Sequence, residues 1–326
     1  MHFKGVSLVY PGATRPAVDD VSLEIEPGAF VVLLGPSGCG KTTLLKMVNR
    51  LYEPTDGDIL LDGQKVGSFP APALRRRIGY VIQQTGLFPH MRIEDNVAVV
   101  PKLLGWDKKA ISQRVDELLE LVGLPPDEYR RRYPGQLSGG QQQRVGLARA
   151  LAADPSTLLM DEPFGALDAI TRTRLQDELR LIQSRLGQTV LFVTHDVEEA
   201  VRLADVMVVM REGKVVQYDE PLRIMVDPAN DFVADLVGAG DVLRRLSLLP
   251  VKAALQPADG RPADGPELKT STDLRSALSL LLESDAERLP VVDDHDQAAG
   301  WIDLASIHRL SAMEPGTGDT HEAVRK

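Results

Sequence analysis

The stretch GPSGCGKT, residues 35–42, decides the fold, and it follows the continuous apolar run AFVVLLG at 29–35. It matches the pattern G-x-x-x-x-G-K-[ST] in the context that the pattern requires, after a predicted strand and before a predicted helix. Glycines allow the backbone to wrap around an anion, and a helix start adds a favourable potential for negative charge. A Gly-rich turn with a chance lysine is the alternative, and both flanking elements argue against it. We therefore predict a phosphate-binding loop in which the N–H groups of 38–42 point inward.

Side chains of this loop have predicted roles. Lys41 is expected to reach the β- and γ-phosphates of a nucleotide, and the Thr42 hydroxyl to ligate Mg²⁺. Cys39 lies at the helix start, which should lower its thiol pKa and raise its reactivity if solvent can reach it; otherwise it fills an unconstrained position. The predicted nucleotide-binding residues of the loop are Gly35, Pro36, Ser37, Gly38, Cys39, Gly40, Lys41, Thr42 and Thr43.

A second segment, STLLMDEP at 156–163, reads as a buried strand that ends in two carboxylates. In enzymes with a phosphate loop, the first acidic residue, here Asp161, holds Mg²⁺ through water. The next, Glu162, is placed to polarise the attacking water. A strand end with ordinary surface acids is the alternative, and the upstream phosphate loop argues against it.

Strand and helix patterns alternate along residues 1–238, which predicts an α/β domain with a mainly parallel central sheet. Residues 1 to about 34 read as strands, with VSLEIE at 21–26 alternating apolar and polar positions. Further strands are predicted at 58–62, 78–82, 156–160, 189–195 and 204–210. The block at about 90–155 has helical spacing, as in ISQRVDELLELVGL (111–124), and is typical of an inserted helical subdomain.

The pattern breaks at VGAGD (237–241), so we predict a second domain over 239–326. A Pro- and Gly-rich loop (256–267) leads to a helix (274–284), strands at 288–293 and 298–303, and a short helix. This domain has 15 acidic and 10 basic residues, a net −5, which disfavours direct binding to anionic lipids. We expect the last dozen residues to be disordered.

The net charge, the cysteine count and the lengths of the apolar runs exclude several classes of protein. The chain of 326 residues has a formal net charge of −10, which argues against a general nucleic-acid binder. A single cysteine excludes an intramolecular disulfide and fits a reducing cytoplasm. We see no signal peptide, and no stretch approaches the roughly 20 apolar residues of a membrane span. A protein of this kind that works at a membrane must dock onto partners that cross it.

One further motif points to a family. LSGGQ (137–141) precedes the helical stretch QQQRVGLARALA, and such a pentapeptide arises by chance with a probability on the order of 10⁻⁴. Its serine and glycines at a helix start predict a second anion site. With this motif in place, residues 1–238 resemble the nucleotide-binding domain of an ABC transporter, a P-loop NTPase fold.

The resemblance implies roles for more residues. Tyr10 matches the aromatic that stacks on adenine, although it could be a strand-edge aromatic. Gln83 matches the glutamine that senses Mg²⁺, acts as a metal ligand and couples to the membrane domain, although Gln84 is its neighbour. His195 in VTHD matches the switch histidine that contacts the γ-phosphate, although an isolated histidine is more often structural. Asp168 in FGALD matches the loop after Glu162 and could also be a helix N-cap. The signature residues are Ser138, Gly139, Gly140 and Gln141.

The resemblance also implies an assembly. In the family two subunits pair, and each ATP lies between Lys41 of one subunit and Ser138 of the other. The implied cofactor is Mg²⁺, bound with ATP as substrate. The implied partners are a second copy of the chain, transmembrane permease subunits and, through the permease, an extracytoplasmic substrate-binding protein. The implied location is peripheral, on the cytoplasmic face of the plasma membrane.

Longer segments suggest the cargo. YVIQQTGLFPHM (80–91), VPKLLGW (100–106), 133–155 and LLMDEPFGALDAITR (158–172) resemble the ATPases of quaternary-amine importers, which take up glycine betaine, carnitine or choline. Importers for amino acids, polyamines or sugars share the core motifs. A soluble ABC ATPase outside transport and a nucleotide-sensing regulator are the alternatives of another class. Residues 274–310 resemble a single CBS motif, whose usual form is a tandem pair; a small α/β cap without a ligand is the alternative.

Overall fold

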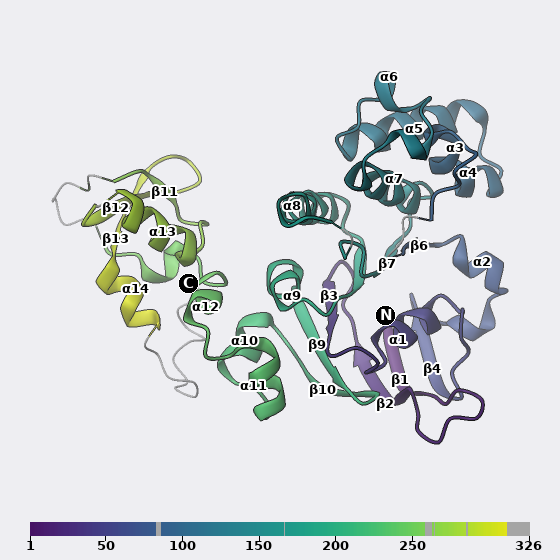
Figure 1. The fold of residues 1–326 in the computed structure, drawn as a ribbon, viewed down its shortest axis with the longest axis horizontal. Coiled ribbons are helices and arrows are strands. Elements are labelled where there is room, and N and C mark those ends of the chain that lie inside the picture. Colours follow the sequence, from purple (N-terminus) through teal and green to yellow (C-terminus); the bar gives the residue numbers. More distant parts are fainter. Residues whose placement is uncertain (83–85, 166, 258–262, 264, 285, 312–326) are drawn as a thin grey trace. The chain divides into compact units, whose positions relative to one another are not determined.

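The computed structural model describes residues 1–82, 86–165, 167–257, 263, 265–284 and 286–311 (Figure 1). They form two compact units, Met1–Tyr218 and a second one from Asp219 onward. The sequence predicted the boundary after residue 238. The compact units divide earlier, after Tyr218, and Leu222 packs against the core of the second unit.

A six-stranded sheet forms the centre of the first unit, in the order β10-β9-β3-β8-β7-β6. Parallel pairs join β3 to β8 and β9, and β7 to β6 and β8. Every residue of β3 and β8 is buried, as expected for parallel strands covered on both faces. The predicted α/β fold with a mainly parallel sheet is therefore confirmed. The strands are β3 (Phe30–Leu34), β6 (Ile78–Val81), β7 (Thr157–Asp161), β8 (Thr189–Val193), β9 (Val206–Arg211) and β10 (Lys214–Asp219).

The N-terminal strands form a separate four-stranded sheet in the order β2-β1-β4-β5. Its pairs are antiparallel. One face packs with helix α1 (Lys41–Val48) into a core that includes Phe3 and Val6 of this sheet, Leu44 and Leu45 of α1, and Leu33 of the central sheet. This core fixes the start of α1, and with it the phosphate loop. The strands are β1 (His2–Leu8), β2 (Val18–Glu24), β4 (Asp56–Leu61) and β5 (Gln64–Lys65).

The remaining helices of the first unit cover the central sheet or form a block of their own. Figure 1 shows α8 (Ala169–Leu186) and α9 (Val197–Leu203) on one side of the sheet and α1 on the other. The block of α3–α7 gathers at one end of the unit, away from the antiparallel sheet. The other helical elements are η1 (Val66–Ser68), α2 (Ala71–Arg75), α3 (Ile93–Val97), α4 (Val99–Leu103), α5 (Lys108–Leu121), α6 (Pro126–Tyr129), η2 (Pro134–Gln136) and α7 (Gly139–Leu151).

The second unit contains the helix, two strands and helix that the sequence predicted. They are α13 (Leu274–Ser284), β12 (Arg288–Val292), β13 (Ala298–Asp303) and α14 (Leu304–Ser311). The strand β11 pairs in parallel with β12, which pairs antiparallel with β13. On α13, Leu274, Ala277 and Leu281 are buried at helical spacing. The other elements are α10 (Pro221–Val226), α11 (Asp231–Val237), α12 (Val242–Leu246), η3 (Val251–Ala254) and β11 (Leu268–Lys269). The last dozen residues, expected to be disordered, lie outside the described residues.

Among the described residues, no helix has both the length and the apolar character needed to cross a membrane.

Candidate active site

Two glycines give the loop between β3 and α1 its shape. Gly35 has a φ of +154°, and a Cβ there would lie 2.3 Å from the carbonyl oxygen of Met210. Gly40 has a φ of +106°, and its Cβ would lie 2.4 Å from the carbonyl oxygen of Ala17. Only glycine meets both the left-handed backbone and the close approach. The predicted strand, loop and helix are therefore confirmed, with Gly40 as the residue before α1.

Lys41, the first residue of α1, is buried with its charge inside the loop. Its Nζ donates to the carbonyl oxygens of Gly35 at 2.6 Å and Pro36 at 3.0 Å. The first N–H groups of a helix have no partner within the helix, so the same end offers further donors. The ammonium of Lys41 and the N–H groups at the start of α1 thus lie close together, an arrangement suited to binding phosphate oxygens.

Cys39 is 3% exposed, and its Sγ lies 3.8 Å from Lys41 Nζ. The thiol packs in the core beneath the loop with Leu44 and Val48. The predicted reactivity of the Cys39 thiol required that solvent reach it, and the buried thiol does not meet this condition.

Two oxygen-bearing side chains that could hold a metal ion meet beside the loop. The hydroxyl of Thr42 donates to Asp161 Oδ1 at 2.8 Å, joining the start of α1 to the end of β7. Burial raises the pKa of Asp161, against the hydrogen bond from Thr42 and the charge of Lys46. A divalent cation would favour the ionised form. Hydroxyl and carboxylate oxygens are ligands that Mg²⁺ accepts, so these residues fit it. Gln83, the third predicted ligand, lies outside the described residues, as does Gln84.

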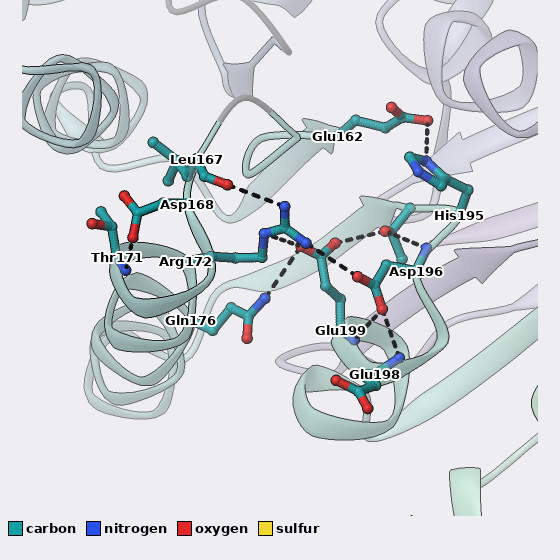
Figure 2. A network of polar contacts seen from close by, with 11 residues as sticks. Glu162, Leu167, Asp168, Thr171, Arg172, Gln176, His195, Asp196, Glu198 and Glu199 are labelled. Atoms are coloured by element: carbon teal, nitrogen blue, oxygen red, sulfur yellow. Dashed lines mark hydrogen bonds and ion pairs between the residues drawn. The ribbon is translucent and has the colours of Figure 1, made fainter.

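Glu162 and His195 meet across the ends of two adjacent strands (Figure 2). The Oε1 atom of Glu162 lies 3.2 Å from His195 Nδ1, and the backbone N–H of Glu162 donates to the carbonyl of Val193 at 3.0 Å. Glu162 has a φ of +45°, a left-handed conformation that costs a non-glycine residue about 1 kcal/mol or more. Its carboxylate is a quarter exposed, whereas the His195 side chain is mostly exposed. An acid held in this way can orient a water molecule.

The LSGGQ segment forms the start of α7. Ser138 is the N-cap: its Oγ accepts from the Gln141 N–H at 3.3 Å, while Gln141 Oε1 accepts from the Ser138 N–H at 2.9 Å. A Cβ at Gly140 would lie 2.9 Å from Thr171 Cγ2, and one at Gly139 would lie 4.0 Å from a methyl of Leu167. The predicted helix start is confirmed, and it packs against the beginning of α8.

Asp168 is the N-cap of α8. Its Oδ1 accepts from the Thr171 N–H at 3.0 Å, and this backbone hydrogen bond lowers the pKa of Asp168. The N-cap interpretation is therefore confirmed, and the match of Asp168 to the family loop after Glu162 stays a prediction.

Tyr10 lies beside the loop, with its hydroxyl 3.1 Å from Thr43 Oγ1. Its ring contacts the Tyr52 ring edge to face, with 5.4 Å between centroids. The sequence analysis missed Tyr52, which lies in the LYEP segment (51–54) that carries no motif.

Sequence analysis also missed the polar side chains behind Glu162 and His195. Arg172 and Gln176 of α8 and Glu199 of α9 join in a network with Thr194 and Asp196. No motif marks them, and the one available signal was their position beside Asp168 and His195.

Known proteins share this architecture and its motifs. Residues 18–165 match the ABC transporter family. The glycine betaine uptake system ATP-binding protein YehX of Escherichia coli strain K12 is 49% identical over 308 residues, which cover 94% of this chain and 98% of that protein. The glycine betaine/carnitine/choline transport ATP-binding protein OpuCA of Bacillus subtilis strain 168 is 44% identical over 318 residues, 98% of this chain and 82% of that protein.

Among solved structures, a dimeric ATP-binding cassette in a post-hydrolysis state, bound to ADP and Pi, matches with a TM-score of 0.60 at 33% identity. The match covers 68% of this chain and 98% of that one. Fold, motifs and relatives agree: the chain belongs to the ABC transporter family as an ATP-hydrolysing subunit.

Proposed function

We propose that this chain hydrolyses MgATP to drive the import of a quaternary-amine osmoprotectant through separate permease subunits. The observation that carries the proposal is the convergence of Lys41, the Thr42–Asp161 pair and the Glu162–His195 pair at the carboxyl ends of β3, β7 and β8. Ligands of open α/β sheets bind at this edge.

The residues divide the work. Lys41 and the N–H groups at the start of α1 hold the phosphates, and Tyr10 beside Thr43 receives the adenine. Thr42 and Asp161 hold Mg²⁺, which neutralises charge on the phosphates when bound. Glu162 orients and polarises the attacking water, and His195 contacts the γ-phosphate. Gln83 retains its predicted role as a Mg²⁺ ligand and sensor.

The active form is proposed to be a homodimer. The two glycines of the signature segment pack against Leu167 and the beginning of α8. In the proposed dimer, Ser138 of a second copy reaches the nucleotide. The dimeric state of the ADP- and Pi-bound relative supports this arrangement. Closing on ATP and opening after hydrolysis would move permease subunits, which are linked to an extracytoplasmic binding protein, at the cytoplasmic face of the membrane.

The proposed cargo is glycine betaine, choline or carnitine. The support is the 49% and 44% identity to ATP-binding proteins named for these solutes, over almost the whole of this chain. The relatives align beyond residue 238, so the similarity includes the second unit and exceeds the shared ATPase motifs. An importer of an amino acid, polyamine or sugar is the remaining alternative.

The second unit is proposed to be a regulatory domain of the CBS type. Its order of α13, β12, β13 and α14 supports this assignment. One motif leaves apolar side chains uncovered within the unit, including Leu282 at 70% and Leu304 at 56% exposure. Pairing of two such units in the dimer would cover them.

Uptake in proteoliposomes tests the cargo. The chain is reconstituted with its permease and binding protein, and ATP-dependent uptake of radiolabelled glycine betaine, choline and carnitine is compared with that of a polyamine, an amino acid and maltose. Uptake confined to the quaternary amines is expected. Transport of another solute class, with none of the three amines, would overturn the proposed cargo and leave the ATPase assignment standing.

A further inference from the structure

A partly buried polar network joins the segment after Glu162 to the segment after His195 (Figure 2). Arg172, on the first turn of α8, stands at its centre. Its Nη2 donates to the carbonyl of Leu167 at 3.1 Å, and its Nη1 donates to Asp196 Oδ2 at 3.2 Å. Its Nε lies 3.9 Å from Glu199 Oε1. One planar guanidinium thus contacts both segments at once, with its donors in a fixed planar arrangement that a flexible lysine does not offer.

Glu199 anchors the side of the network that carries His195. The residue is 5% exposed, and its carboxylate accepts from the Thr194 hydroxyl at 2.6 Å and from Gln176 Nε2 at 3.2 Å. The Thr194 hydroxyl in turn accepts from the Asp196 N–H at 3.0 Å. His195 therefore lies between two residues whose polar groups are fixed by one buried carboxylate.

The other side of the network carries Glu162. Leu167 lies between Glu162 and α8 in the chain, and its carbonyl accepts a hydrogen bond from Arg172. Gly139 and Gly140 of the signature segment also pack against Leu167 and Thr171, respectively. A shift of Arg172 would therefore reach Glu162, His195 and the start of α7 together.

We propose that Arg172 is a positioning residue for ATP hydrolysis. It fixes the positions of the Leu167 carbonyl and of the Asp196 and Glu199 carboxylates relative to one another. In this way it sets the distance between Glu162 and His195. The inference rests on the proposed roles of those two residues. Arg172 acts through the two segments that it joins.

The main rival is that Arg172 only fastens α8 to α9. The chain contains a matched control, because Arg202 of α9 binds Asp177 of α8 through a two-pronged ion pair, with Nη2 at 2.7 and 2.9 Å from the carboxylate oxygens. This pair links the same helices and touches neither loop. A packing role predicts similar effects from Arg172→Ala and Arg202→Ala, whereas a positioning role predicts different ones.

The test measures kcat and KM for ATP, the affinity for a fluorescent ATP analogue and the melting temperature of the full-length chain. Arg172→Ala is expected to lower kcat about tenfold or more, because small displacements of catalytic groups are costly, with KM and analogue affinity changed by less than about twofold. Arg172→Lys should recover part of kcat. Glu199→Gln should lower kcat, and the Arg172→Ala/Glu199→Gln pair should be no slower than Arg172→Ala alone, because both act through one network.

Arg202→Ala should keep the wild-type kcat. Unchanged kcat in Arg172→Ala would overturn the proposal, and so would equal losses in Arg172→Ala and Arg202→Ala. If Arg172→Ala does not fold, the same comparison is made with Arg172→Lys, where an unchanged kcat overturns it. A wild-type chain without ATPase activity would instead refute the proposed function.

Discussion

The carboxylate of Glu162 lies 3.2 Å from the imidazole of His195, although 33 positions separate the two residues in the chain. Both follow buried strands, and β7 and β8 are parallel neighbours, so their carboxyl ends bring the two side chains to the same edge. The left-handed backbone of Glu162 turns the chain sharply there. The parallel pairing of β7 with β8 and the strained backbone of Glu162 therefore bring the two proposed catalytic side chains together.

The phosphate loop depends on Gly40. Gly40→Ala should weaken ATP binding at least about tenfold, because the Cβ would meet the Ala17 carbonyl at 2.4 Å. Gly63→Ala is the control, since Gly63 also has a positive φ, +76°, but has nothing within 4 Å of its Cβ position. Equilibrium binding of ATP and melting temperatures distinguish the two. Equal losses of ATP affinity would show that the backbone strain, and not the close approach, matters.

The composite site can be tested by mixing two damaged chains. Lys41→Ala removes the cation of the loop, and Ser138→Arg disrupts the signature helix start. Neither variant alone should dimerise with ATP, whereas the mixture should form a heterodimer with one intact site. Size-exclusion chromatography with and without ATP measures this. Failure of the mixture to pair would contradict the head-to-tail arrangement.

Glu199 should make stability depend on pH. Burial raises its pKa above the ordinary value of 4.5, so the folded chain binds this proton more tightly than the unfolded chain. The resulting stabilisation is fully present below pH 4.5 and is lost as the pH rises through the raised pKa. Urea unfolding of wild type and Glu199→Gln across this window should show the wild type losing stability relative to the variant as pH rises. The exposed Glu198→Gln is the control, and a wild type that gains relative stability would contradict the burial argument.

Local patterns predicted the phosphate loop, α1 and the buried strands because each depends on neighbours in the chain. The separate antiparallel sheet was not foreseen, since β1 pairs with β4, about 50 residues away, and such pairing leaves little trace in a strand's own sequence. The available signal was the alternation of apolar and polar residues in VSLEIE, which is typical of antiparallel strands with one solvent-exposed face.

The network around Arg172 could not be predicted from the sequence, apart from the position of its members near Asp168 and His195. A glutamate on a short helix is usually exposed, and nothing in VEEAVRL distinguishes the buried Glu199 from the exposed Glu198. Only the packing of α8 against α9 makes one of them a partner of Thr194 and Gln176. Cys39 is a second example: its position in a motif predicted a reactive thiol if solvent could reach it, and only the structure shows that the core beneath the loop buries it.

The second unit should be dispensable for hydrolysis and needed for regulation. A chain ending at residue 238 is expected to keep basal ATPase activity within about twofold, because the first unit has its own core. A chain ending at Tyr218 should do the same, since the compact unit ends there. In the reconstituted transporter, either truncation should weaken the dependence of uptake on salt. Identical salt responses of truncated and intact transporters would make the unit a structural cap.

The central claim is that Glu162 activates water at a site that binds MgATP independently of it. The most direct measurement is single-turnover hydrolysis by Glu162→Gln, with ATP binding and dimerisation measured in parallel. Binding should persist, a closed dimer should accumulate with ATP, and hydrolysis should slow by at least about 10²-fold, because the cradle remains while the base is lost. Near-normal turnover by Glu162→Gln would contradict the account.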